Sequence, residues 1–204
     1  MSGRFEATGD GGAAIALDEI EISILRSLTV QFLELLGPGE QSEASADEPE
    51  DLLAGLFTEG PSRPPADPAL ARLFPDAYGG PDASGEGPGG ETARDASAEF
   101  RRYTENDLRA GKREHALAVV RCLDALTPAG DGGAVLTLGA DDSRRWLGAL
   151  NDLRLTIGTR LEVTDDEDGG GLYDLPDEDP RKPMVMAYLW LGALQETLVE
   201  TLMP

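Results

Sequence analysis

Few residues in this chain are of a type that could perform acid, base or nucleophilic chemistry. A nucleophile needs a general base beside it, yet the chain has a single histidine, His115, and a single cysteine, Cys122. Neither the G-x-S-x-G elbow of serine hydrolases nor the H-E-x-x-H zinc motif occurs. His115 stands alone on a predicted helix, so we interpret it as a structural or surface residue, with a ligand or pH-sensing role as the alternative. This pattern predicts no catalytic site.

Two motifs for cations and nucleotides fail when their geometry is considered. The acidic stretch 164–175 fits a calcium loop only if Gly169 is its sixth residue, and Leu175 then stands where the bidentate glutamate is required. The glycines between residues 85 and 90 match G-x-G-x-x-G, but no predicted strand precedes them, as a dinucleotide site requires. We therefore expect no cofactor and no metal ion.

Pairs of carboxylates such as Asp141 and Asp142 could divide acid and base roles between them. A simpler explanation is that they begin a helix, where unsatisfied N–H groups and the helix dipole favour negative charge. The catalytic interpretation of these carboxylates, an acidic metal-dependent enzyme, is the alternative.

The composition narrows the possible partners and compartment. The 204 residues include 39 acidic and 17 basic side chains, giving a net charge of -22. Such a charge argues against autonomous binding to nucleic acid or to an anionic membrane. The single cysteine permits no intramolecular disulfide, and residues 1–10 contain no apolar signal core. We expect a soluble cytoplasmic protein with no membrane span and leave direct DNA binding and a homodimer open.

Apolar periodicity predicts a mainly α fold, a compact helical domain over residues 1–204 with a small two-stranded β element. The expected helices cover 18–36, 51–57, 70–74, 91–126 (continuous or broken near Gly111), 141–157 and 180–202. Mobile loops are expected at about 38–50, 79–90 and 164–178, where apolar side chains are scarce.

The two expected strands have similar surroundings. Residues 13–17 and 134–138 are short apolar segments, each preceded by two glycines and followed by an acidic helix start. We predict that they pair with each other and bring the N-termini of the two following helices to one side; chance similarity of short apolar segments is the alternative.

The helix near the C-terminus is apolar on most of its circumference. Residues 184–191 contain no charge, and Asp179 and Pro180 are suited to its N-cap and first position. A helix of this kind must be surrounded by other elements. It is too short for a confident membrane span, which needs about 20 apolar residues.

Two groups of polar residues are candidates for partner binding. The segment from Arg94 to Arg121 carries seven basic and five acidic residues and includes Arg101 and Arg102. It is either a solvated face with i,i+4 ion pairs or a docking surface. The second group lies among apolar leucines and forms either an internal hydrogen-bonded network or a recognition patch. Its members are Asn151, Asp152, Arg154 and Arg160.

Three segments resemble the actinomycete oxidative-stress transcriptional regulator family. They are Asp67–Tyr78, Glu99–Arg109 and, most specifically, Trp146–Leu161 with its Leu-Asn-Asp-Leu-Arg-Leu core. The resemblance implies a cytoplasmic regulator that works with an alternative sigma factor and, in its best-known member, senses oxidation through a pair of cysteines.

The cysteine content of this chain departs from that pattern. Cys122 has Ala118 and Leu126 at the four-residue offsets, so it forms no intramolecular pair. As a candidate redox thiol, Cys122 could form an intermolecular disulfide or a mixed adduct with another thiol.

Together, these observations predict a noncatalytic regulator or adaptor in the oxidative-stress response. The resemblance implies a sigma factor or RNA polymerase as its protein partner. The alternatives are the acidic metal-dependent enzyme and an accessory protein of the Clp protease system.

Overall fold

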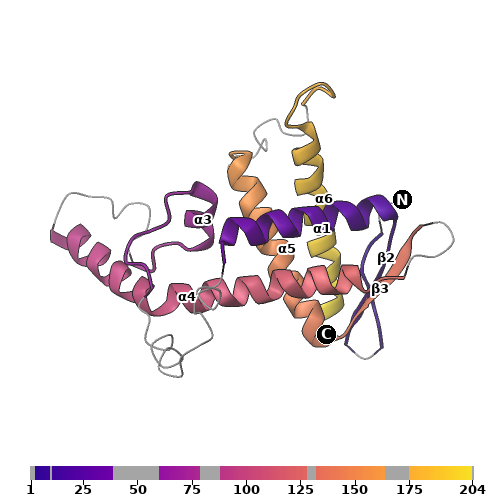
Figure 1. The fold of residues 1–204 in the computed structure, drawn as a ribbon, viewed down its shortest axis with the longest axis horizontal. Helices are drawn as coiled ribbons and strands as arrows, with labels where there is room; N and C mark the ends of the chain where they lie inside the picture. The colour runs from indigo at the N-terminus through magenta and orange to yellow at the C-terminus, as the bar shows by residue number, and fades with distance from the viewer. Residues whose placement is uncertain are drawn as a thin grey trace, which may run out of the picture.

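A computed structural model describes residues 3–9, 11–38, 60–78, 88–127, 132–163 and 175–203. Within these ranges, five helices and three short strands follow in the order β1, β2, α1, α3, α4, β3, α5 and α6 (Figure 1). The protein is therefore mainly helical with a small antiparallel sheet, which confirms the predicted fold class. The helix expected over 51–57 and most of the three expected loops lie outside the described residues.

The small sheet joins segments that are far apart in the sequence. β2 (Ala13–Leu17) pairs antiparallel with β3 (Ala134–Leu138), and β1 (Glu6–Ala7) pairs with the other edge of β2. Alternate residues of β2 and β3 are buried, as expected when one face of a sheet packs against helices. The predicted strand pairing is confirmed. The sequence does not predict β1, because two residues are too few to show alternation.

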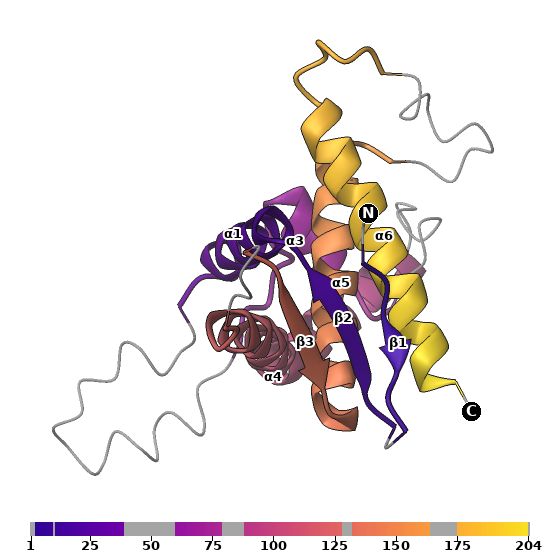
Figure 2. The ribbon, with the colours of Figure 1, turned by 90° about the vertical axis from the view of Figure 1, so that its right-hand side faces the viewer.

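The direction of this pairing contradicts the expected position of the helix N-termini. Leu17 lies opposite Ala134, so the end of β2 is beside the start of β3. α1 (Glu19–Leu36) follows β2 and α5 (Ala140–Arg160) follows β3, so the two helices begin at opposite ends of the sheet (Figure 2). Similar flanking sequences suit parallel and antiparallel pairs equally and do not fix the direction.

The boundaries of α1 are those that its capping residues predict. The Asp18 side chain accepts a hydrogen bond from the Glu21 N–H at 2.8 Å, and the Glu21 carboxylate accepts one from the Asp18 N–H at 3.0 Å. This reciprocal arrangement is a capping box. At the other end, Gly37 adopts a positive φ of 77°, a conformation that glycine tolerates best.

α4 (Pro88–Asp124) is the longest of the described helices. It begins inside the stretch 79–90 that was expected to be a loop, and it continues without a break through Gly111. Figures 1 and 2 show α1 lying along its second half. The two helices run antiparallel, because Arg26 pairs with Asp124 at one end and Arg109 reaches Leu36 at the other.

α5 is the central helix. It contacts α1, α3 (Pro68–Leu73), α4 and α6 (Lys182–Leu202), as well as β3. Trp146 of α5 is fully buried, and its ring meets that of Phe5 edge to face with 6.2 Å between centroids. The other buried apolar residues of this helix are Ala149, Leu150, Leu153 and Ile157. Their spacing of three or four residues places one continuous α5 face in the core.

α6 is covered on one side only, contrary to the expectation that it is surrounded. Val185, Leu191 and Leu194 are buried, but Met184 is 39% exposed and Met186 is 56% exposed. Among the described residues, no helix is long and apolar enough to cross a membrane. The exposed methionines thus give α6 an apolar face that the other described residues do not cover.

α6 also begins later than its sequence predicts. Its first helical residue is Lys182, and Pro183 lies in the first turn. Asp179 is not the N-cap, because its carboxylate accepts a hydrogen bond from the Arg181 N–H at 2.8 Å in a turn before the helix. An aspartate followed by a proline suits this kind of turn as well as a helix start.

We expect opposite effects from alanine at two helical glycines. Gly111→Ala raises the free energy of unfolding by about 0.5–1 kcal/mol, because no atom lies within 4 Å of the added Cβ and alanine is the better helix former. At Gly148 of α5 the added Cβ would lie 2.6 Å from Nδ1 of His115, so Gly148→Ala lowers it by about 1–3 kcal/mol. Urea unfolding measures both changes. Equal effects of the two substitutions would contradict the close approach of α4 to α5.

Candidate functional site

A buried carboxylate organises the basic residues of α4. Glu105 is 2% exposed, and its two oxygens accept hydrogen bonds from Arg101 at 2.5 Å and from Arg109 at 2.8 Å. Arg101 is itself buried and also donates to the carbonyl oxygen of Phe74 at 3.0 Å and to Asp76 at 2.9 Å. Arg101 thus ties α4 to the segment that follows α3.

Two arginines of α4 bind the C-terminal end of α1. Arg109 donates to the carbonyl oxygen of Leu36 at 2.7 Å, and Arg113 donates to the carbonyl oxygens of Leu33 and Gly37. The last carbonyls of a helix lack partners within the helix and carry partial negative charge. These arginines therefore stabilise the end of α1 and hold it against α4.

A lysine of α4 bridges to the central helix. Lys112 Nζ lies 2.7 Å from Oδ1 of Asp152, which is buried on α5. The guanidinium of Arg109 lies 4.6 Å from the ring centre of Phe74, and Lys112 Nζ lies 5.9 Å from it. Phe74 thus joins α3 to α4 through cation–π contacts as well as burial.

The polar residues of α5 face three different neighbours. Asp152 contacts α4, whereas Arg154 donates to Gln195 of α6 at 2.7 Å and lies 5.2 Å from the Tyr188 ring centre. Arg160 contacts Asp67, the N-cap of α3, at 2.7 Å. The structure does not bring these residues onto one surface.

The N-cap of α3 has a perturbed pKa. Burial disfavours the ionised form of Asp67, but hydrogen bonds from the backbone N–H groups of Leu70 and Ala69, together with Arg160, outweigh it and lower the pKa below its ordinary value. A carboxylate that accepts several hydrogen bonds is stabilised in its charged form. Ionised Asp67 therefore stabilises both α3 and its contact with α5.

The residues predicted for partner binding now separate by exposure. Arg101 and Asp152 are buried, Arg102 and Arg154 are partly buried, and Asn151 and Arg160 are exposed. Arg101 and Arg102 are neighbours in sequence, but their side chains leave α4 in different directions, and that of Arg101 joins the Glu105 network.

The two chemically distinctive single residues both lie on α4. Cys122 is partly buried and packs against the hydrophobic core. His115 is partly buried where α4 approaches Gly148 of α5. Among the described residues, no group of three or more His, Cys, Asp or Glu side chains could hold a metal ion.

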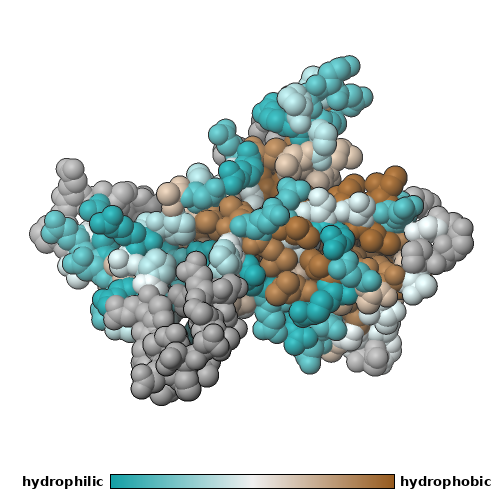
Figure 3. Space-filling view, in the orientation of Figure 1, coloured by the Kyte–Doolittle hydropathy of each residue, from teal (hydrophilic) through white to brown (hydrophobic). Residues whose placement is uncertain are grey.

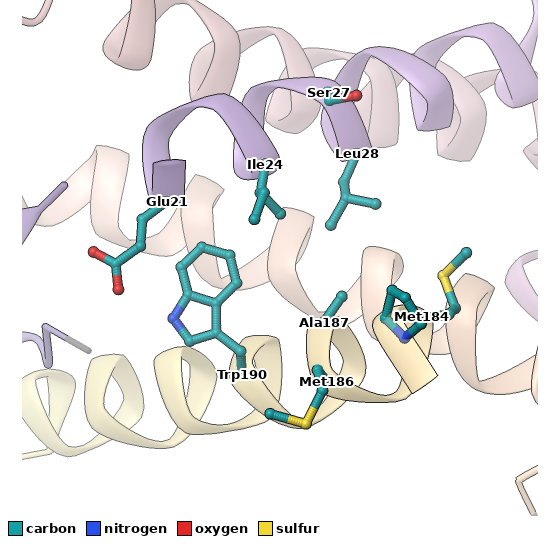
Figure 4. Close-up of a pocket in the computed structure, with 9 residues that line it drawn as sticks. Glu21, Ile24, Ser27, Leu28, Met184, Met186, Ala187 and Trp190 are labelled. Carbon is teal, nitrogen blue, oxygen red and sulfur yellow. The ribbon is translucent and has the colours of Figure 1, made fainter. Parts of the chain in front are cut away.

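The sequence does not identify the open apolar groove between α1 and α6. The groove has a volume of about 610 Å³, and Figure 4 shows Ile24 and Leu28 of α1 facing Trp190, Ala187 and Met184 of α6. Figure 3 shows apolar residues gathered along α1 and the adjoining part of α6. The other residues that line the groove are Glu21, Ser27, Pro183 and Met186. The uncharged stretch 184–191 is the signal that could have indicated it.

The described residues thus define an α-helical protein whose basic residues fix its helices and whose open face is an apolar groove. Residues 1–202 match the family described as a domain of unknown function, DUF2017, and the chain belongs to this family.

Its relatives include mycobacterial regulators. Over 187 residues the chain is 35% identical to the oxidative stress regulator AosR of Mycobacterium tuberculosis and to that of Mycobacterium bovis, covering 90% of this chain and 78% of each relative. A relative from Mycobacterium leprae is 34% identical over 184 residues, which cover 90% of this chain and 79% of the relative. No solved structure matches. The chain is therefore homologous to AosR, and the resemblance seen in its sequence is confirmed.

We expect Glu105→Ala to destabilise the protein by about 3–5 kcal/mol, because it removes the buried carboxylate that pairs with both Arg101 and Arg109. Arg144→Ala, which removes an ion pair with 67% and 84% exposed side chains, should change stability by less than about 1 kcal/mol. Chemical unfolding followed by circular dichroism compares them. Similar losses in the two variants would mean that Glu105 contributes no more than a surface charge.

The lowered pKa of Asp67 predicts a specific dependence on pH. Because the folded-state pKa lies below the unfolded one, ionised Asp67 contributes stability above its ordinary pKa, and this contribution is lost as pH falls through the folded-state value. Asp67→Asn keeps an N-cap acceptor but removes the charge. The stability difference between wild type and Asp67→Asn should shrink as the solution is acidified. A difference that stays constant from neutral to acid pH would contradict this assignment.

Proposed function

We propose that this protein is a noncatalytic regulator of the oxidative-stress response that contacts the transcription machinery, through a sigma factor or RNA polymerase. The observation that carries the proposal is its homology to AosR, a protein named as an oxidative stress regulator, at 35% identity over 90% of the chain. The proposal concerns protein contact and assigns no reaction to the chain.

The distribution of charge supports a protein partner over free DNA. The net charge is -22, so the field around the chain repels a phosphate backbone. Several of its basic side chains are already used in contacts between α4 and other segments, namely Arg101, Arg109, Lys112 and Arg113. A basic protein surface is attracted by the remaining acidic exterior, and contact with a promoter would come through that partner.

The proposal keeps Cys122 as the candidate thiol and the exposed residues of α4 and α5 as candidate contacts. Cys122 is partly buried on α4 and is the only cysteine of the chain, so a disulfide at this thiol needs an external thiol or a second chain as partner. Asn151, Arg160 and Arg102 retain exposed surface and stay candidate contacts. Arg154 links α5 to α6 through Gln195, and Arg160 links α5 to Asp67 at the start of α3.

A crosslinked pull-down from oxidised and unoxidised cells tests the function. We expect recovery of RNA polymerase or a sigma factor, with a yield that changes on oxidation, since the chain is homologous to the oxidative stress regulator AosR. Cys122→Ser tests the thiol, and Arg154→Ala, compared with the exposed Arg160→Ala, tests the α5 residues. Recovery of Clp components alone would support the accessory-protein alternative and contradict regulation of transcription.

A further inference from the structure

The groove between α1 and α6 is a two-walled trough. Ile24 and Leu28 are one turn apart on α1, and Met184, Ala187 and Trp190 follow at three-residue steps on α6 (Figure 4). Residues at these spacings lie on one face of a helix. Two apolar ridges therefore face each other, and they are open along their length.

This shape suits a third helix better than a small molecule. Small-ligand pockets bury most of the surface of what they hold, whereas here Ile24 is 40% exposed and Met186 is 56% exposed on the rim. An apolar stripe of a helix, with residues three and four positions apart, fits between two such ridges. Ile20, which is 69% exposed one turn before Ile24, extends the apolar wall beyond the groove.

Charge indicates which kind of helix fits. Of the described residues that line the groove, Glu21 alone is charged, and the chain carries a net charge of -22. A second copy would bring the same negative charge to the interface, and an acidic helix would be repelled. An amphipathic helix with Lys or Arg beside its apolar stripe complements both the groove and its surroundings.

The groove also contains oxidisable sulfur. Met184 and Met186, two exposed methionines, line its α6 side. Hydrogen peroxide transfers one oxygen atom to such a sulfur: the S–O bond of a sulfoxide forms and the O–O bond of the peroxide breaks. The sulfur is oxidised by two electrons, and the peroxide is reduced to water. No bond within the protein breaks. The product is polar and disrupts methionine-rich apolar contacts.

We infer that the α1–α6 groove docks an amphipathic helix with basic flanks, and that oxidation of Met184 and Met186 by peroxide weakens this docking. The oxidative signal then acts directly on the contact surface. The inference builds on the proposed function, because it names the surface and the chemistry through which a protein partner would be regulated.

Binding of labelled model peptides, followed by fluorescence anisotropy, tests the groove. The probes are a leucine–lysine amphipathic helix, a scrambled peptide of the same composition and a leucine–glutamate helix with the same stripe. We expect the first to bind at least about tenfold more tightly than the other two. Met186→Lys should abolish this preference, and Met203→Lys, at a methionine that is 63% exposed outside the groove, should preserve it. Equal binding of the first two peptides, or no effect of Met186→Lys in a folded variant, overturns the docking site.

Peroxide treatment tests the switch. Affinity for the leucine–lysine helix should fall by at least about tenfold in wild type and in Met203→Leu. It should not fall in the double variant Met184→Leu with Met186→Leu, because leucine keeps the wall apolar and has no sulfur. Methionine sulfoxide reductases should restore wild-type affinity. A fall that persists in the double variant places the oxidised group elsewhere and overturns the inference.

Two further outcomes separate this inference from the proposed function. If the pull-down recovers the transcription machinery equally with wild type and Met186→Lys, the regulator role stands and the groove assignment fails. If peptides bind as expected but no transcription component is recovered, the groove stands and the proposed function fails. Sedimentation showing a dimer that Met186→Lys dissociates would assign the groove to a second copy and overturn the helix-docking proposal.

Discussion

The buried carboxylate of Glu105 is the interaction on which the positions of α3 and of the end of α1 against α4 depend. A charge removed from water needs hydrogen-bonded partners of opposite charge, and Arg101 and Arg109 supply them from one turn before and one turn after on α4. Each arginine has more donors than Glu105 can accept. The remaining donors bind the carbonyl oxygens of Phe74 and Leu36, so one buried acid positions both α3 and the end of α1 on α4.

Local sequence signals predict the elements of this fold well. Asp18 and Gly37 mark the ends of α1, because capping uses atoms within a few residues of the helix end. The alternation of buried and exposed residues along β2 and β3 is also a local pattern, within five residues in each strand. The direction of their pairing depends on segments more than a hundred residues apart, and the covering of α6 depends on α5 and on the N-terminal segment around Phe5. Local patterns carry no information about either.

The contacts of the polar residues depend on tertiary structure more than those of the apolar residues do. Spacing along α4 predicts the pairs of Glu105 with its i±4 arginines. It cannot predict that Lys112 meets Asp152, since that contact depends on how α4 crosses α5. The basic residues of α4, whose pattern is also typical of a solvated or docking face, therefore include residues that link α4 to other elements. The sequence does not predict the apolar groove, because each of its two helices has the pattern of a helix that faces a core.

Many basic side chains lie in contacts between elements, whereas acidic side chains dominate the exterior, and this distribution affects how a partner is recognised. With Arg101, Arg109 and Lys112 engaged inside, the exterior is left strongly acidic, and long-range attraction of a basic partner depends on that net charge. The groove contributes mainly contact over short distances, through Trp190 and the methionines. Oxidation of a thioether changes polarity without changing net charge, so the field that brings the partner to the surface is preserved. Its effect must therefore fall on the rate at which the partner leaves, because association is governed mainly by charge and dissociation by the quality of the apolar contact.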